Sequence, residues 1–198
     1  MPPSEPQIDR MINAAIQCLQ EVRAHRLTVE ELAERTGVEV SALRTLFADD
    51  RALTEAVGNY VAVQLTDAMS RAVATARPGD NRAALIALAT AYVTWAQENR
   101  GLYGIVSERL LTTDGGAFAF HRYDASFVPL VRRLLGETEG RASHRAAIGR
   151  SFMFGITTLA LDNRLEVWMR PGTSAGDEMA ATITDFIDML MAWQPPAA

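Results

Sequence analysis

The sequence predicts an all-α protein made of an N-terminal helix-turn-helix domain and a larger helical domain. Residues 27–53 read as two short helices joined at Thr36-Gly37 and followed by the start of a longer helix. Beyond residue 60, apolar residues recur at helical spacing, with neither strand-like alternation nor an Asn-Gly hairpin. We expect about nine helices in all. Residues 1–55 form the first domain in this prediction, and residues 56–198 form the second.

The first two helices are predicted from an apolar face and from end signals. One face of the first helix carries Ile8, Ile12, Ala15, Ile16 and Leu19. Thr28 precedes an apolar run with Glu31 three residues on, a capping-box pattern that predicts a helix starting at Val29. Gly37 fits the C-cap of that helix, because a positive φ costs little only for glycine.

The next helix should span roughly residues 39–46. Leu43 and Phe47 are spaced to point back into the core. Asp49 is a suitable N-cap for a long helix that starts near Asp50 and links the two domains.

The rest of the chain is expected to form a series of further helices, separated by Gly and Pro. Pro129 should kink or interrupt the helix that contains it. The predicted ranges are 50–75, 81–99, 102–111, 118–135, 141–169 and 178–193.

These residues resemble the TetR family of bacterial transcriptional regulators over about the first 55 to 60 positions of the chain. The matching residues are Ala14-Ala15, Leu27-Thr28-Val29, Leu32-Ala33-Glu34-Arg35, Gly37-Val38, Leu43, Phe47 and Ala52-Leu53. Residues 91–103 and 152–161 are similar to a common version of the family's regulatory domain, with Arg150 and Phe154 in the places of a Trp and a His. The resemblance implies a homodimer that binds palindromic double-stranded operator DNA.

The predicted DNA-reading face departs from the family in its charge. Four arginines stand against seven acids between Arg26 and Glu55, a balance of −3, and Asp50 replaces a lysine that normally meets a phosphate. Phosphate neutralisation supplies most sequence-independent DNA affinity, so we expect weak, salt-sensitive or dimer-dependent binding. The candidate DNA-contacting residues are Thr28, Ser41, Arg44, Thr45 and Arg51.

Two further surfaces are predicted in the second domain, and core packing is the alternative interpretation of both. An apolar effector pocket should be lined by Tyr92, Trp95, Tyr103, Phe120, Tyr123, Phe127 and Phe152. A dimer interface formed by the last two helices should include Ile156, Leu159, Trp168, Ile183, Phe186 and Leu190.

Catalysis, metals and membranes are not expected. The three histidines are scattered without ligand spacing, Cys18 is alone, and no Gly-x-Ser-x-Gly or phosphate loop occurs. We therefore predict no enzyme activity and no cofactor. A net charge of −5 argues against general nucleic-acid coating or binding to anionic membranes. Because no signal peptide or long apolar run is found, a cytoplasmic protein is expected.

Together these features predict a transcriptional repressor that a small apolar effector releases from DNA. The acidic face leaves an alternative open: a TetR-like sensor or protein-interaction dimer whose DNA binding is weakened or lost.

Overall fold

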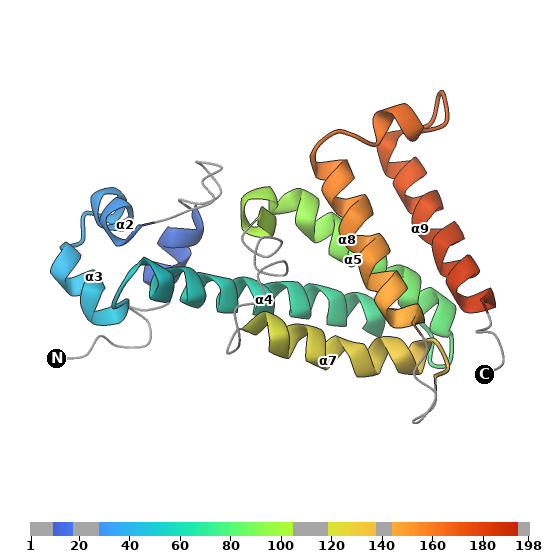
Figure 1. Ribbon diagram of the computed structural model, residues 1–198, viewed down its shortest axis with the longest axis horizontal. Helices are drawn as coiled ribbons and strands as arrows, with labels where there is room; N and C mark the ends of the chain where they lie inside the picture. Colours follow the sequence, from blue (N-terminus) through green and yellow to red (C-terminus); the bar gives the residue numbers. More distant parts are fainter. Residues whose placement is uncertain (1–9, 18–27, 105–118, 138–143, 194–198) are drawn as a thin grey trace. The chain divides into compact units, whose positions relative to one another are not determined.

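The computed structural model describes residues 10–17, 28–104, 119–137 and 144–193, and the side chains of 119–126 lie outside this description. The described part contains helices and turns but no strand, which confirms the all-α prediction (Figure 1). Residues 10–17 and 100–104 are helical. The other elements are α2 (Val29–Thr36), α3 (Val40–Leu46), α4 (Asp50–Ala74), α5 (Asn81–Glu98), α7 (Ala119–Leu134), α8 (Arg145–Leu161), η1 (Glu166–Trp168) and α9 (Ala175–Ala192).

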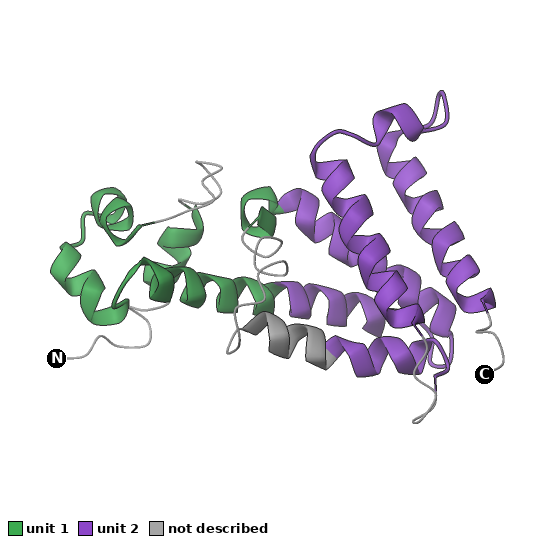
Figure 2. Ribbon diagram, in the orientation of Figure 1, with its two compact units in different colours: residues 1–64, 99–123 green, residues 65–98, 124–198 purple. Residues whose placement is uncertain are grey.

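The chain divides into two compact units, coloured separately in Figure 2. Unit 1 comprises residues 1–64 and 99–123, and unit 2 comprises residues 65–98 and 124–198. Helix α4 contributes residues to both units, because the division falls after Gln64.

Unit 1 contains the predicted helix-turn-helix. Helices α2 and α3 pack against each other, and Leu43 and Phe47 are buried as predicted. The apolar core of this region consists of Ile12, Ala15, Ile16, Val29, Leu32, Ala33, Leu43, Phe47, Leu53, Val57 and Val61. This small buried core therefore fixes the orientation of the short helix α3.

The helix ends in unit 1 follow the predicted signals. Thr28 and Glu31 form a capping box, so α2 begins at Val29. Gly37 has a φ of 67°, the left-handed conformation expected of a C-cap glycine. The Asp49 carboxylate accepts a hydrogen bond from the Ala52 N–H at 2.8 Å, which confirms Asp49 as the cap of α4.

Unit 2 is a helical layer in which α5 packs on α8 and α9, and α8 packs on α9. Helices α8 and α9 approach each other closely at Gly149, where a Cβ would lie 3.3 Å from Leu190 Cδ2. The rings of Phe152 and Phe186 stack across the same pair of helices, with centroids 3.7 Å apart and planes 9° from parallel.

Several predicted boundaries are wrong. Helix α8 ends at Leu161, because Asn163 adopts a left-handed φ of 54° and the Arg164 N–H bonds the Leu159 carbonyl at 2.8 Å. Helix α9 starts at Ala175, earlier than expected, because Ser174 caps it. Helix α7 is continuous through Pro129. The predicted helix over residues 102–111 is seen to residue 104, and the rest lies outside the described residues.

Candidate functional site

The exposed face of α3 is the candidate reading surface. Leu43 is fully buried, so its side of α3 faces the core and the opposite side of the helix faces solvent. Ser41, Arg44 and Thr45 lie on that side at spacings of three and four residues and are all exposed. The structure therefore brings these three predicted residues together on one surface.

Arg44, the main cation of this surface, is paired within the chain. Its Nη2 lies 2.5 Å from Glu30 Oε1 on α2, and its Nη1 donates a weaker bond to the Ala48 carbonyl at 3.4 Å. The hydrogen bond from Arg44 lowers the pKa of Glu30 below its ordinary value, and the same bond raises the pKa of Arg44. The Glu30 carboxylate offsets part of the positive charge that a phosphate or base edge would otherwise meet, although both side chains remain exposed.

The N-terminus of α2 is also occupied by internal acceptors. Asp50 Oδ1 accepts the Val29 N–H at 2.8 Å, from 21 residues further along the chain. Thr28 Oγ1 accepts the Glu31 N–H at 3.1 Å, and Glu31 Oε2 accepts the Thr28 N–H at 3.0 Å. A helix N-terminus normally favours an external anion. Here carboxylates of the protein already fill that role.

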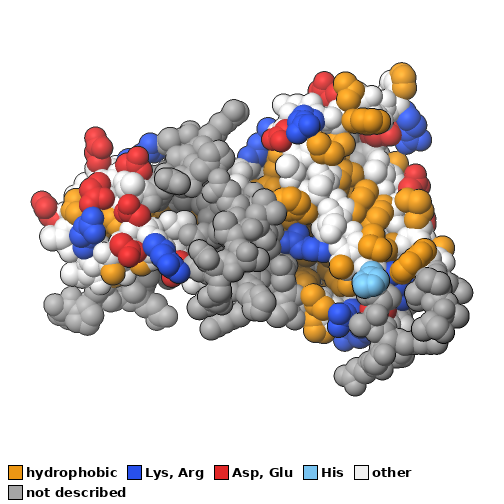
Figure 3. All heavy atoms as spheres, viewed as in Figure 1, with side chains coloured by type: hydrophobic (Ala, Val, Ile, Leu, Met, Phe, Trp, Pro, Cys, Tyr) orange, Lys and Arg blue, Asp and Glu red, His pale blue; other side chains and the backbone are white. Residues whose placement is uncertain are grey.

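Two of the remaining candidate residues, Thr45 and Arg51, make hydrogen bonds within the chain. Thr45 Oγ1 donates to the Ala42 carbonyl at 2.6 Å, and Arg51 Nε lies 2.9 Å from Glu55 Oε1. Ser41 is exposed. At the left of Figure 3, acidic and arginine side chains are interleaved over α2 and α3. The surface is thus a network of ion pairs and not a cationic patch.

The aromatic residues predicted for an effector pocket are mostly buried. Tyr92 and Trp95 lie in α5 and Phe127 in α7, all within unit 2, whereas Tyr103 is buried in unit 1. Phe152 is half-buried against Phe186 of α9. The side chains of the two other predicted residues, Phe120 and Tyr123, lie outside the described part of the structure.

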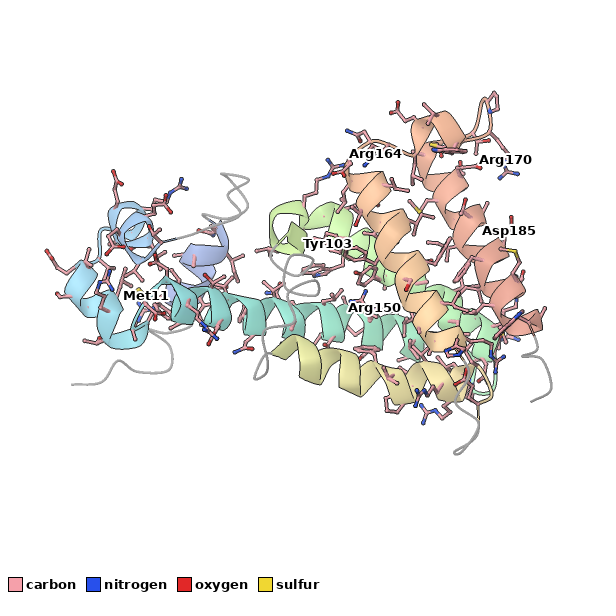
Figure 4. All side chains as sticks on the ribbon, in the orientation of Figure 1. Met11, Tyr103, Arg150, Arg164, Arg170 and Asp185 are labelled. Carbon is pink, nitrogen blue, oxygen red and sulfur yellow. The ribbon has the colours of Figure 1, made fainter. Side chains whose placement is uncertain are left out.

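Arg150 is a polar member of this region that sequence reasoning did not assign to the pocket. Its Nη1 donates to Tyr92 Oη at 3.2 Å, and its guanidinium carbon lies 5.6 Å from the centre of the Tyr92 ring. Figure 4 labels Arg150 on α8. The signal in the sequence was its position in the place of the family's Trp. Seven residues further along α8, Thr157 is fully buried, and its Oγ1 has no hydrogen-bond partner in the described part of the chain.

The residues predicted for a dimer interface differ in their exposure. Ile156, Ile183 and Leu190 are buried inside unit 2 itself, because α5, α8 and α9 pack on one another. Leu159 and Phe186 are half-buried, and Trp168 in η1 is 81% exposed. Other exposed apolar side chains in the same part of the chain are Ile148, Val167, Met189 and Trp193.

The described residues hold neither a cluster of metal ligands nor a membrane-spanning helix. Among them, no three His, Cys, Asp or Glu side chains gather where a metal ion would be held. None of the described helices is long and apolar enough to cross a membrane.

The sequence of residues 85–187, which contribute to both units, decides the family. Residues 85–187 match the model of the tetracyclin repressor-like C-terminal domain, which is more than half of the chain. The chain belongs to the TetR family. No protein of curated function matches the sequence of this TetR-family chain.

Solved structures with the same fold cover nearly the whole TetR-family chain. A protein of unknown function from Rhodococcus sp. RHA1 is 26% identical, with a TM-score of 0.74 over 91% of this chain and 93% of that one. A putative transcriptional regulator from Pseudomonas aeruginosa PAO1 is 18% identical, with a TM-score of 0.66 over 96% and 93%. The transcriptional regulator FadR from Bacillus subtilis, solved with stearoyl-CoA, is 12% identical, with a TM-score of 0.63 over 93% and 97%.

Proposed function

We propose that this TetR-family chain is an effector-responsive transcriptional repressor that binds operator DNA as a homodimer. The observation that carries the proposal is the exposed stripe of Ser41, Arg44 and Thr45 on a short helix held by a buried Leu43. Guanidinium and hydroxyl groups on an exposed helix are suited to base edges and phosphates in a major groove.

The homodimer is supported by exposed apolar residues in the last third of the chain. Trp168 and Val167 are 81% and 86% exposed, and Met189 on α9 is 64% exposed. Hydrophobic side chains are visible over α8 and α9 in Figure 3. Large exposed apolar groups favour burial against a partner. A two-fold dimer would then set two reading helices about 34–36 Å apart, one turn of DNA, or a multiple of it.

The effector proposal rests on buried aromatic side chains of unit 2, including Tyr92, Trp95 and Phe127. Apolar walls with few polar groups are typical of sites for small hydrophobic ligands. The stearoyl-CoA bound to the Bacillus subtilis regulator supports an apolar chain as part of the effector. Effector binding would act on the DNA-binding surface through α4, the helix shared by both units.

The experiment that tests this function is selection of bound fragments from the source genome by the purified full-length protein at low salt. We expect enrichment of one palindromic sequence, lost in Arg44→Ala. Arg35→Ala is the matched control, because Arg35 is an exposed arginine at the end of α2 and its removal changes the charge equally. Uniform enrichment, or equal loss in both variants, contradicts sequence-specific reading by α3.

A second candidate function is supported by the internal pairing of the same surface. If the carboxylates of Glu30 and Asp50 hold Arg44 and the α2 N-terminus permanently, the protein is a sensor or protein-interaction dimer without DNA binding. Complete absence of fragment enrichment, together with a dimer in solution, favours this function over the first.

A further inference from the structure

The groups that would meet a DNA backbone are held by three acidic residues of the same surface. Glu30 pairs with Arg44 at 2.5 Å, and Asp50 accepts the Val29 N–H at 2.8 Å. Glu31 accepts the Thr28 N–H at 3.0 Å. Each carboxylate oxygen stands where a phosphate oxygen would make the same charge-assisted hydrogen bond.

These contacts are specific and differ from general surface acidity. Glu34 is also exposed on α2, yet it makes no hydrogen bond or ion pair with its side chain among the described residues. Asp50 reaches across 21 residues of sequence to cap a helix other than its own. Two elements, α2 and the first turn of α4, are therefore joined by an acidic group at the N-terminus of α2.

We propose that Glu30 and Asp50 are specificity-determining residues, because they occupy Arg44 and the α2 N-terminus and so suppress sequence-independent binding to the DNA backbone. This inference rests on the proposed DNA-binding function. A random duplex offers phosphates but no base sequence that matches α3, so phosphate contacts alone must displace the internal carboxylates. An operator adds matching base edges for α3, and these contacts favour displacement only at the correct sequence. Penalising the wrong partner in this way is a recognised route to specificity.

Repulsion between the carboxylate and an approaching phosphate sets the direction and the size of the effect. An exposed ion pair is weak by itself, so Glu30 does not lock Arg44. A carboxylate close to an approaching phosphate nevertheless adds repulsion and removes one phosphate contact. We expect that removing the Glu30 carboxylate strengthens binding to random DNA by about three- to ten-fold at low salt.

The test compares Glu30→Ala with Glu34→Ala in the full-length protein. Both variants remove one negative charge from α2, but only Glu30 contacts Arg44. The probe is a random-sequence 30-base-pair duplex, titrated by fluorescence anisotropy across a range of salt concentrations. In Glu30→Ala we expect affinity at least about three-fold above that of Glu34→Ala. The slope of log K against log salt should become steeper by about 0.9, which corresponds to one additional phosphate contact.

Asp50→Asn is the second variant, chosen because an asparagine oxygen still accepts the Val29 N–H and preserves the cap. This variant keeps the Val29 N–H occupied but removes the carboxylate charge beside it, so an approaching phosphate meets less repulsion. It should therefore raise random-duplex affinity above that of Glu34→Ala. For a genomic palindrome recovered with wild-type protein, the ratio of operator to random affinity should fall in both Glu30→Ala and Asp50→Asn.

Three outcomes decide the matter. Larger gains in Glu30→Ala and Asp50→Asn, with the steeper salt slope, support the inference. Equal gains in these variants and in Glu34→Ala overturn it and leave the proposed DNA-binding function intact, because the effect is then net charge alone. If wild-type protein and every variant fail to bind any duplex, both the DNA-binding function and this inference are wrong.

Discussion

Thr157 provides the sharpest test of the packing of unit 2. Its side chain lies in α8 with no exposed surface, and Oγ1 has no partner among the described residues. A buried hydroxyl without a hydrogen bond costs about 1–3 kcal/mol of desolvation. Thr157→Val replaces that hydroxyl with a methyl group and keeps the β-branch. We therefore expect the free energy of unfolding to rise by about 1–2 kcal/mol.

Thr158→Val is the matched control on the next position of the same helix. The Thr158 Oγ1 donates to the Phe154 carbonyl at 2.9 Å, so this substitution removes a hydrogen bond that is made. Its stability should stay the same or fall by about 1 kcal/mol.

The measurement is urea denaturation followed by circular dichroism, at one fixed protein concentration because dimerisation contributes to apparent stability. Thermal unfolding should show Thr157→Val melting about 2–4 °C above wild type per kcal/mol gained. A loss of stability in Thr157→Val would show that the hydroxyl has a partner and refute the reasoning. Equal changes in the two variants would refute it as well.

The remaining predictions concern the helix-turn-helix of unit 1 and the exposed apolar residues. Thr28→Ala removes the acceptor for the Glu31 N–H. It should lower the stability of the helix-turn-helix by about 1 kcal/mol in hydrogen-exchange measurements. Unchanged protection of α2 would contradict this. In an NMR titration the pKa of Glu30 should lie below that of an ordinary glutamate, because Arg44 donates a hydrogen bond to its carboxylate, and it should rise toward the ordinary value in Arg44→Ala. Because the folded pKa is lowered, the stabilisation is present above the unfolded pKa and is lost as pH falls through the folded pKa. Trp168→Ser should weaken self-association by at least about ten-fold in sedimentation experiments, whereas Val63→Ser on α4, also exposed, should not; equal dissociation constants would place Trp168 outside the interface.

Local signals in the sequence predicted the helix ends in the helix-turn-helix of unit 1 well. The capping box of Thr28 and Glu31, the glycine at 37 and the cap at Asp49 each act within about four residues of chain. Side-chain spacing also predicted which face of α3 is exposed, because a single buried Leu43 sets the orientation of a helix this short. Asn163 was missed because an asparagine ends a helix only when its backbone turns left-handed, and the residue type does not require this.

The sequence by itself determined the fold class, the start of α2, the core-facing side of α3 and the acidity of the reading face. Only the tertiary structure decided which partners the charged groups take. Glu30 and Arg44 are 14 residues apart, Asp50 and Val29 are 21 apart, and Arg150 and Tyr92 are 58 apart. It also decided that Ile156, Ile183 and Leu190 fill the core of unit 2, since apolar periodicity on a helix cannot distinguish the inside of a subunit from a partner surface. Hydrogen bonds and burial between distant segments depend on how helices pack in three dimensions, and helical periodicity along the chain does not contain that information.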